Sequence, residues 1–168
     1  MNFYDGDFAI ENGKSVNFDK LVTGFIKTED YSLIHSSVPL LCHDVFIYIA
    51  DKGVLLVKRN ELPESGQYWP IGGRVERGIS TEESLRNKTK KESGLFLEDI
   101  QFVGCGRTFF QTDPFNHGKG TDTFNLVFFA KGVGDIKLNS SFTDFKIINP
   151  SEYNLDFKKN MNPFVLNM

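Results

Sequence analysis

The sequence is poor in the features that mark several large protein classes. It has two cysteines, Cys42 and Cys105, which stand far apart inside apolar runs, and we interpret both as reduced core residues. No stretch is long enough to span a membrane. The N-terminus has no basic segment followed by an apolar one, so we expect no signal peptide. These features favour a cytoplasmic protein that does not use a membrane as a partner.

Long runs of positive charge are also missing. The net charge of the 168 residues is -3, and no run of Lys or Arg is long enough to follow a phosphate backbone. We therefore expect no nucleic-acid polymer as a partner, whereas a nucleotide-sized anion needs only two or three local cations. The apolar fraction of 40% and the charged fraction of 24% are typical of one globular domain. The 17 phenylalanines indicate a core or pocket built from aromatic rings.

The order of apolar patterns predicts a mixed α/β or α+β domain in which one helix packs on a sheet. A turn signal at residues 51–53 joins the first two β-rich runs as a hairpin. Residues 1–25 have no clear period, so we expect an N-terminal extension, either an edge hairpin or a flexible lead-in, before a domain over residues 26–168. The expected strands cover residues 40–49, 54–58, 100–110, 123–130 and 142–148, and one short helix is expected after residue 150.

One helix, over residues 81–93, is predicted by its two ends. Ser80 as N-cap and Glu83 three residues later form a capping box, and Gly94 supplies the stop. Only Leu85 is strongly apolar within these residues, so we expect the helix to lie on the surface or to line a wet cleft.

The segment from Gly72 to Leu95 resembles a Nudix box, whose full pattern is G-x5-E-x7-R-E-U-x-E-E-x-G-U with U a bulky aliphatic residue. The box is degenerate here. Gly73, Glu92, Gly94 and Leu95 fit the pattern. The departures are Ile79 for the first Glu, Asn87 for the Arg, Lys88 for the next Glu, Thr89 for the aliphatic residue and Lys91 for the first Glu of the pair.

The wider chain is similar to the GDP-mannose mannosyl hydrolase branch of the Nudix superfamily, whose own box is incomplete and keeps one metal-binding Glu. The similarity covers about residues 26–145. It implies a Nudix fold, with a mixed sheet sandwiched by helices, and a homodimer. The similar segments are Glu29-Asp30-Tyr31, Ser37 to Leu40, Asp44-Val45-Phe46, Lys58-Arg59-Asn60, Gly66, Tyr68-Trp69, Gly72 to Val75, Thr89 with Glu92, Gln101-Phe102 with Gly104, and Gly120-Thr121-Asp122.

The resemblance implies a metal site. Glu92 and the Gly72 carbonyl would bind Mg²⁺, with Mn²⁺ as the alternative, because hard oxygen ligands suit these cations. Lys88 and Lys91 stand where other family members carry carboxylates and share one helical face with Glu92. Either one metal binds at low occupancy, or the lysines, Lys88 above all, bind phosphate directly as point charges. On spacing alone, this face is a solvated one with a Lys88–Glu92 pair.

The same resemblance assigns the substrate-binding side chains. Arg59 and Arg74 match arginines that hold the leaving diphosphate, and the alternative is two surface arginines. Asp44 matches a polar residue near the sugar, although an Asp in an apolar strand is also read as a buried, satisfied carboxylate. Tyr68 and Trp69 are candidates to stack on a base, with packing as the alternative.

The general base does not carry over from the family. The family's His in the loop before residues 142–148 is absent. Asp144 matches an acid that follows it, and His117 is a second candidate. His43 neighbours Asp44 in a strand and so points to the opposite face, and His35 has no visible partner. Loss of the base would remove a factor of about 10²–10⁴ in rate.

Three hypotheses follow. The first is hydrolysis of a nucleotide sugar, GDP-mannose or a related GDP-hexose, by water attack at the sugar C1 with release of the nucleoside diphosphate. The second is a Nudix diphosphohydrolase of another substrate such as ADP-ribose, which the missing box residues count against. The third is a nucleotide or nucleotide-sugar binding protein that has lost the chemistry, which the two lysines and the absent His favour.

Overall fold

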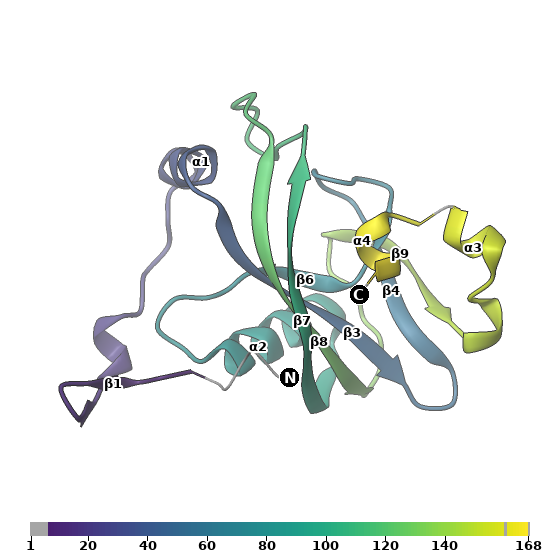
Figure 1. The fold of residues 1–168 in the computed structure, drawn as a ribbon, viewed down its shortest axis with the longest axis horizontal. Helices are drawn as coiled ribbons and strands as arrows, with labels where there is room; N and C mark the ends of the chain where they lie inside the picture. Colours follow the sequence, from purple (N-terminus) through teal and green to yellow (C-terminus); the bar gives the residue numbers. More distant parts are fainter. Residues whose placement is uncertain (1–6, 160, 168) are drawn as a thin grey trace.

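The computed structural model describes residues 7–159 and 161–167. It is an α+β arrangement built around a mixed sheet, with one long helix against the sheet and shorter helices at the periphery (Figure 1). The strands are β1 (Ile10–Glu11), β2 (Lys14–Ser15), β3 (Leu40–Ile49), β4 (Gly53–Arg59), β5 (Tyr68–Trp69), β6 (Ile71–Arg74), β7 (Phe96–Phe110), β8 (Thr121–Val133) and β9 (Phe142–Ile148). The α-helices are α1 (Thr28–Ser37), α2 (Thr81–Ser93), α3 (Leu155–Lys159) and α4 (Pro163–Asn167), and the 3₁₀ turns are η1 (Phe18–Lys20) and η2 (Pro150–Glu152).

Strand β3 lies at the centre of the sheet. It runs parallel to β8 along its whole length, from Leu40 opposite Thr123 to Ile49 opposite Gly132. Its other edge is shared, because the first half pairs with β6 and the second half with β4, both antiparallel. β7 extends the sheet beyond β8, and β9 extends it beyond β4. Successive residues of β3 therefore reach opposite faces of the sheet.

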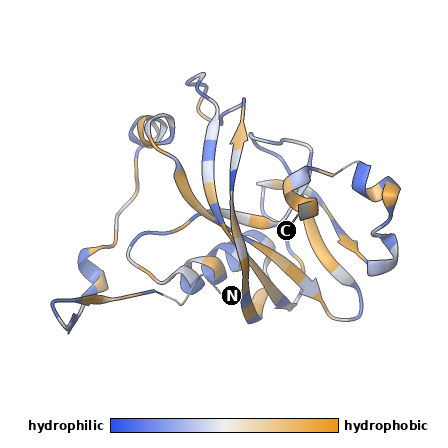
Figure 2. Cartoon of the chain, viewed as in Figure 1, coloured by the Kyte–Doolittle hydropathy of each residue, from blue (hydrophilic) through white to orange (hydrophobic). Residues whose placement is uncertain are grey.

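Helix α2 packs on the sheet through a polar surface. Ser80 caps it by accepting a hydrogen bond at 3.1 Å from a backbone N–H three residues on, and Gly94 ends it in the left-handed conformation. Figure 2 shows the helix mostly in hydrophilic colours. Leu85 is nevertheless fully buried in the core, and the Ser84 hydroxyl bonds His43 Nε2 at 2.7 Å. One face of the polar helix is therefore a packing surface rather than a solvated one.

The core lies between α2 and the sheet. Val45, Ile47, Val57 and Leu95 are fully buried there, and Phe102 packs against the cluster from β7. Alternation along β3 sends His43, Val45 and Ile47 to this side. The even-numbered residues of β3 are therefore left for the other side.

The predicted helix over residues 81–93 and the strands over 40–49 and 142–148 are confirmed, as is the hairpin at 51–53. The other three predicted strands are present, and each extends beyond the predicted residues at one or both ends. The C-terminal segment holds two short helices instead of the one expected, α3 and α4.

The N-terminal segment differs from the expectation in two ways. β1 and β2 form a hairpin of their own and do not extend the main sheet. Asp7 reaches α2, where its carboxylate accepts hydrogen bonds from the Thr81 backbone N–H at 2.7 Å and from the Thr81 hydroxyl at 2.9 Å. Helix α1 was not predicted. The division of the chain at residue 25 stays a prediction, and residues 1–6 lie outside the described part.

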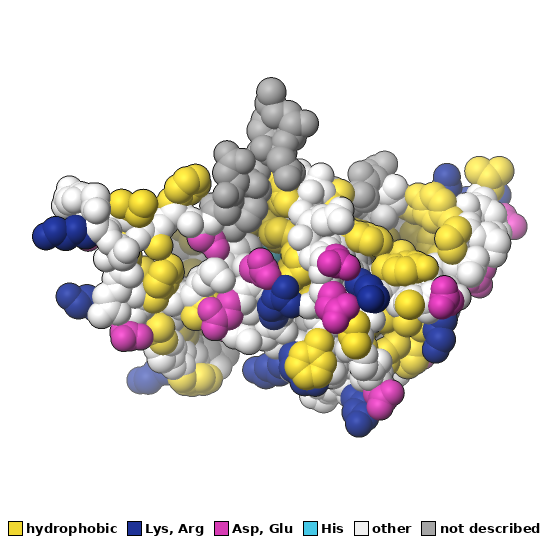
Figure 3. All heavy atoms as spheres, turned by 90° about the horizontal axis from the view of Figure 1, so that it is seen from below, with side chains coloured by type: hydrophobic (Ala, Val, Ile, Leu, Met, Phe, Trp, Pro, Cys, Tyr) yellow, Lys and Arg dark blue, Asp and Glu magenta, His cyan; other side chains and the backbone are white. Residues whose placement is uncertain are grey.

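The surface of the described residues is mixed in charge. On the face drawn in Figure 3, Lys and Arg side chains stand among Asp and Glu side chains, and no continuous basic stripe crosses it. No helix within residues 7–159 and 161–167 is long and apolar enough to cross a membrane.

Candidate active site

A cavity of about 550 Å³ opens between β3, β6, α1, α2 and the loops around them. It gathers side chains from segments far apart in the sequence. Most of the residues predicted as functional line it: Asp44, Arg59, Trp69, Gly72, Arg74, Lys88 and Glu92, together with Lys91.

Asp44 lies on the wall of this cavity. Alternation along β3 places Leu40, Cys42 and Asp44 on the cavity side. Asp44 pairs with Gly72 of β6, where a Cβ would overlap Asp44 Oδ1 and the His43 carbonyl oxygen, so only glycine fits. Burial raises the pKa of Asp44 to about 7, against the opposing effects of the Arg59 guanidinium and a Trp69 hydrogen bond. The carboxyl group therefore titrates much nearer to neutral pH than that of an exposed aspartate.

Glu92 and Lys88 form an ion pair inside the cavity. Lys88 Nζ lies 2.7 Å from Glu92 Oε1, and the second carboxylate oxygen is buried without a partner among the described residues. The ammonium group also lies over β6, since a Cβ on Gly73 would be 3.1 Å from Lys88 Nζ. Burial raises the pKa of Glu92, and the Lys88 charge acts in the opposite direction. The predicted Lys88–Glu92 pair is present, but it faces a cavity rather than bulk solvent.

The two arginines are held by different means. Arg59 Nε donates to the Pro63 carbonyl oxygen at 2.8 Å, and burial lowers the pKa of its guanidinium. Arg74 lies with its guanidinium carbon 4.9 Å from the centroid of the Tyr31 ring. Both side chains line the same cavity as Lys88, so three cations from β4, β6 and α2 surround one space.

Trp69 is a wall of the cavity rather than an open stacking platform. Its ring is parallel to Phe164 of α4, with centroids 5.1 Å apart, and meets Phe110 edge to face. Its hydrogen bond to Asp44 fixes that carboxylate. Phe164 therefore covers one face of the indole that a base was expected to use.

Two predicted side chains lie outside the cavity lining. Tyr68 donates a hydrogen bond at 2.8 Å to Asp144 on the exposed side of β5 and β9, and Lys146 lies over the tyrosine ring. The physical reason is the two-residue period of a strand, because Trp69 faces the cavity and Tyr68 must face away. The structure thus places both side chains outside the lining of this cavity, and the base role of Asp144 and the substrate-binding role of Tyr68 stay predictions.

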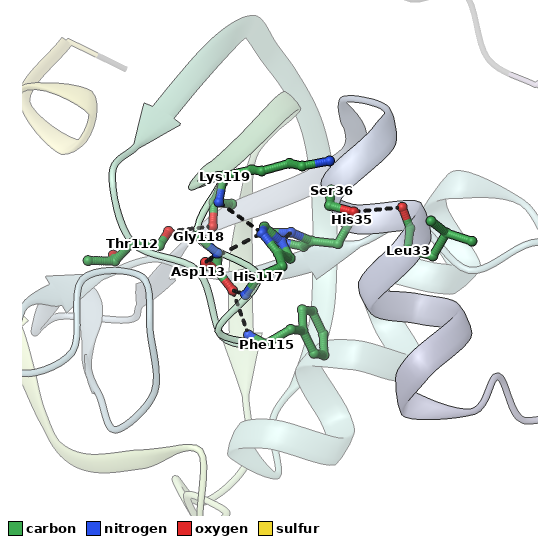
Figure 4. Close-up of polar contacts among 10 residues, drawn as sticks. Leu33, His35, Ser36, Thr112, Asp113, Phe115, His117, Gly118 and Lys119 are labelled. Carbon is green, nitrogen blue, oxygen red and sulfur yellow. Dashed lines mark hydrogen bonds and ion pairs between the residues drawn. The ribbon is translucent and has the colours of Figure 1, made fainter.

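Sequence reasoning missed the contribution of α1. Tyr31 and His35 of this helix line the cavity, as does Phe115 from the loop between β7 and β8. His35 Nδ1 lies 2.8 Å from His117 Nε2, so both histidines have the partner that the sequence did not reveal (Figure 4). Asp113 accepts backbone hydrogen bonds from residues 115, 117 and 118 and holds the loop in shape. The Gly-rich composition of this loop was the available signal.

Comparison with known proteins agrees with this architecture. The model of the NUDIX domain matches residues 42–168. The chain belongs to the NUDIX domain family. A NUDIX hydrolase from Nitrosomonas europaea is 18% identical, with a TM-score of 0.59 over 77% of this chain and 85% of that one. A NUDIX-family hydrolase from Clostridium perfringens is also 18% identical, with a TM-score of 0.58 over 78% and 93%.

A third NUDIX structure, from Shewanella oneidensis NrtR, was solved with ADP ribose and is 17% identical, with a TM-score of 0.55 over 74% of this chain and 79% of that one. At these identities the likeness shows a shared fold. Together with the family match, it confirms the predicted Nudix fold.

NUDIX hydrolases generally use a divalent cation such as Mg²⁺, and the cavity allows a test of whether these residues fit one. The described residues hold no cluster of three or more Asp, Glu, His or Cys side chains that could bind a metal. Glu92 is already paired with Lys88. An ammonium about 5 Å from a divalent cation costs about 7 kcal/mol at an effective dielectric near 20, most of which is relieved if the partly exposed lysine bends into water. The expected Mg²⁺ or Mn²⁺ on Gly72 and Glu92 fits this arrangement poorly, because Lys88 pairs with one Glu92 oxygen and its charge repels a cation at the other.

Proposed function

We propose that this NUDIX domain hydrolyses a nucleotide sugar, GDP-mannose or a related GDP-hexose, by attack of water at the sugar C1, and that it releases the nucleoside diphosphate. The observation that carries the proposal is the convergence of Arg59, Arg74 and Lys88 on a cavity that also holds Asp44. Charge builds up on the leaving diphosphate, and fixed cations in a partly buried cavity stabilise it best.

The proposed step uses the side chains at one end of the cavity. Asp44 accepts a proton from the attacking water, because its pKa of about 7 suits a general base at neutral pH. The water oxygen forms the new bond to C1 while the bond between C1 and the phosphate oxygen breaks, and the electron pair leaves with the diphosphate. Arg59 and Arg74 bind the diphosphate oxygens as guanidinium groups, and Lys88 supplies a positive charge where relatives use a divalent cation.

Attack at carbon is favoured over attack at phosphorus by the composition of the site. A phosphoanhydride hydrolase needs several metal-binding carboxylates, and here Lys88 and Lys91 stand at two of those positions. The ADP-ribose bound to the NrtR domain supports a diphosphate-linked nucleoside as the class of ligand. A binding protein without turnover is the second candidate, and it is favoured by the same two lysines.

The experiment is hydrolysis of GDP-mannose in water enriched in ¹⁸O, with mass analysis of both products. Attack at C1 places the label in mannose and leaves GDP unlabelled. Label in a phosphate product, or release of GMP, would instead support the phosphorus-attacking alternative. GDP binding without turnover would support the binding protein. Asp44→Asn is the matched variant, and we expect it to bind GDP and to lose turnover by about 10²–10⁴-fold.

A further inference from the structure

The charged side chains are not spread evenly over the cavity. Asp44, Arg59, Lys88 and Glu92 form its charged end, and Leu40, Thr108, Thr123, Asn125, His35 and Phe115 form an end that we call the neutral end. Arg74 lies between the two ends, because it pairs with Cys42 of β3 and its guanidinium carbon is 4.9 Å from the Tyr31 ring centroid. Leu40 and Asp44 are four residues apart on β3, which is about 13 Å along a strand. Thr123 lies opposite Leu40, so the neutral end continues onto β8. A ligand whose diphosphate binds the charged end and whose sugar C1 meets Asp44 must direct its nucleoside to the neutral end.

The hydrogen bonds around His117 fix which of its nitrogens carries a proton. The Lys119 backbone N–H donates to His117 Nδ1 at 3.1 Å, and a backbone amide can only donate. Asp113 Oδ2 faces the same nitrogen at the longer distance of 3.5 Å, so the closer Lys119 N–H decides its role. Nδ1 is therefore the acceptor, and the proton of the neutral ring is on Nε2. That N–H points at His35 Nδ1, 2.8 Å away (Figure 4). The opposite tautomer would set a His117 N–H against the Lys119 N–H.

The same reasoning extends to His35. Its Nδ1 accepts from His117, so the proton of the neutral His35 ring is on Nε2. This nitrogen has no hydrogen-bond partner among the described residues, in a side chain that lines the neutral end and is 6% exposed. Phe115 meets the imidazole edge to face with centroids 5.2 Å apart, which holds the ring in place. His35 thus presents a donor to the cavity and cannot serve as the missing base.

Asn125 presents an acceptor at the same end. Its Nδ2 donates to the hydroxyls of Thr108 and Thr123, each at 3.1 Å, and these hydroxyls bond each other at 2.6 Å. If the amide were reversed, its oxygen would need a proton from each threonine hydroxyl, and none would be left for the bond between the two hydroxyls. The number of available protons therefore fixes the orientation of the amide. The amide oxygen is then left without a hydrogen-bond partner among the described residues, in a side chain that lines the cavity.

We propose that His35 and Asn125 form a nucleoside subsite, in which a tautomer-locked N–H and a fixed carbonyl oxygen read the hydrogen-bonding edge of a nucleobase. The subsite takes a flat heterocycle that carries an acceptor beside a donor, and Tyr31 and Phe115 supply aromatic edges to its ring. The inference rests on the proposed function for the direction in which the ligand lies, because that direction follows from C1 at Asp44.

The test compares two probes, GDP and inorganic pyrophosphate, by calorimetric titration. We expect His35→Phe, which keeps the ring contact and removes the donor, to weaken GDP binding by about tenfold and to leave pyrophosphate binding within twofold. His35→Gln restores a donor near the Nε2 position and should recover most of the GDP affinity. Equal losses for both probes, no loss for either, or wild-type GDP binding no tighter than pyrophosphate binding would overturn the subsite.

A second measurement needs no variant. The chain has only three histidines, so long-range ¹H–¹⁵N spectra of the imidazoles resolve each tautomer. We expect His35 to carry its proton on Nε2 and to be unprotonated on Nδ1, and the reverse would overturn the proposal even if a substitution fails to fold. Neither measurement uses turnover. The subsite can therefore be supported even if the protein does not hydrolyse GDP-mannose, and results that contradict the subsite do not contradict the proposed hydrolysis.

Discussion

Replacing Lys88 tests whether a side chain has taken the place of the family's cation. Lys88→Met keeps the length of the side chain and removes its charge. The lost charge-assisted contact to diphosphate corresponds to about 1.5–3 kcal/mol, or roughly a 10- to 150-fold weaker binding of GDP in the presence of EDTA. The variant also leaves Glu92 buried without its partner, and because Lys88 is 30% exposed we expect about 1–3 kcal/mol of lost stability rather than the full value for a buried pair.

The matched control is Lys90→Met on the same helix. Lys90 is exposed, donates to the Gly94 carbonyl oxygen at 2.9 Å and lies over the Phe96 ring, away from the cavity. We expect its GDP affinity to equal that of the wild type. Lys88→Glu should create a pair of carboxylates and make GDP binding depend on Mg²⁺. Wild-type binding that disappears in EDTA and returns with Mg²⁺ would refute the reasoning, because it would mean that a metal and not Lys88 supplies the charge.

Three further predictions use the same region. The pKa of Asp44 is raised in the folded state, from 3.8 to about 7. Its protonated form therefore stabilises the fold below pH 4, and this stability, about 4 kcal/mol at most, is lost as the pH rises toward 7. Asp44→Asn should remove this pH dependence from the midpoint of urea unfolding. Gly72→Ala should abolish GDP binding or folding, and circular dichroism separates the two. Ser80→Ala should cost about 1 kcal/mol in thermal unfolding with GDP affinity unchanged, and a larger loss would mean that the cap does more than satisfy one N–H.

Local signals made much of the fold predictable. Both ends of α2 can be predicted from single residues. The Ser80 side chain accepts a hydrogen bond at the start of the helix, and Gly94, which has no Cβ, adopts the left-handed conformation that ends it. The strand from residue 40 to residue 49 was equally clear because its apolar run is long. Helix α1 was not predictable in this way, because its only buried side chain is His35 and its stabilising contact is with a histidine 82 positions away.

The candidate site shows the same division. Asp44, Arg59 and Glu92 were found because family resemblance marks their positions, and the cavity brings them together. Tyr68 and Asp144 lie outside the cavity lining. Strand alternation could have predicted this for Tyr68, because its neighbour Trp69 is buried and successive residues of a strand point to opposite faces. The pairing of Lys88 with Glu92 was visible from helical spacing, but its burial depends on β6 packing across it, which no local pattern encodes.

The position of Trp69 makes intrinsic fluorescence a probe of the cavity. It is the single tryptophan of the chain, and its indole N–H reaches Asp44 while its ring stacks on Phe164. All tryptophan emission therefore comes from one position on the cavity wall. Ligand titrations can therefore be followed by tryptophan emission without a dye.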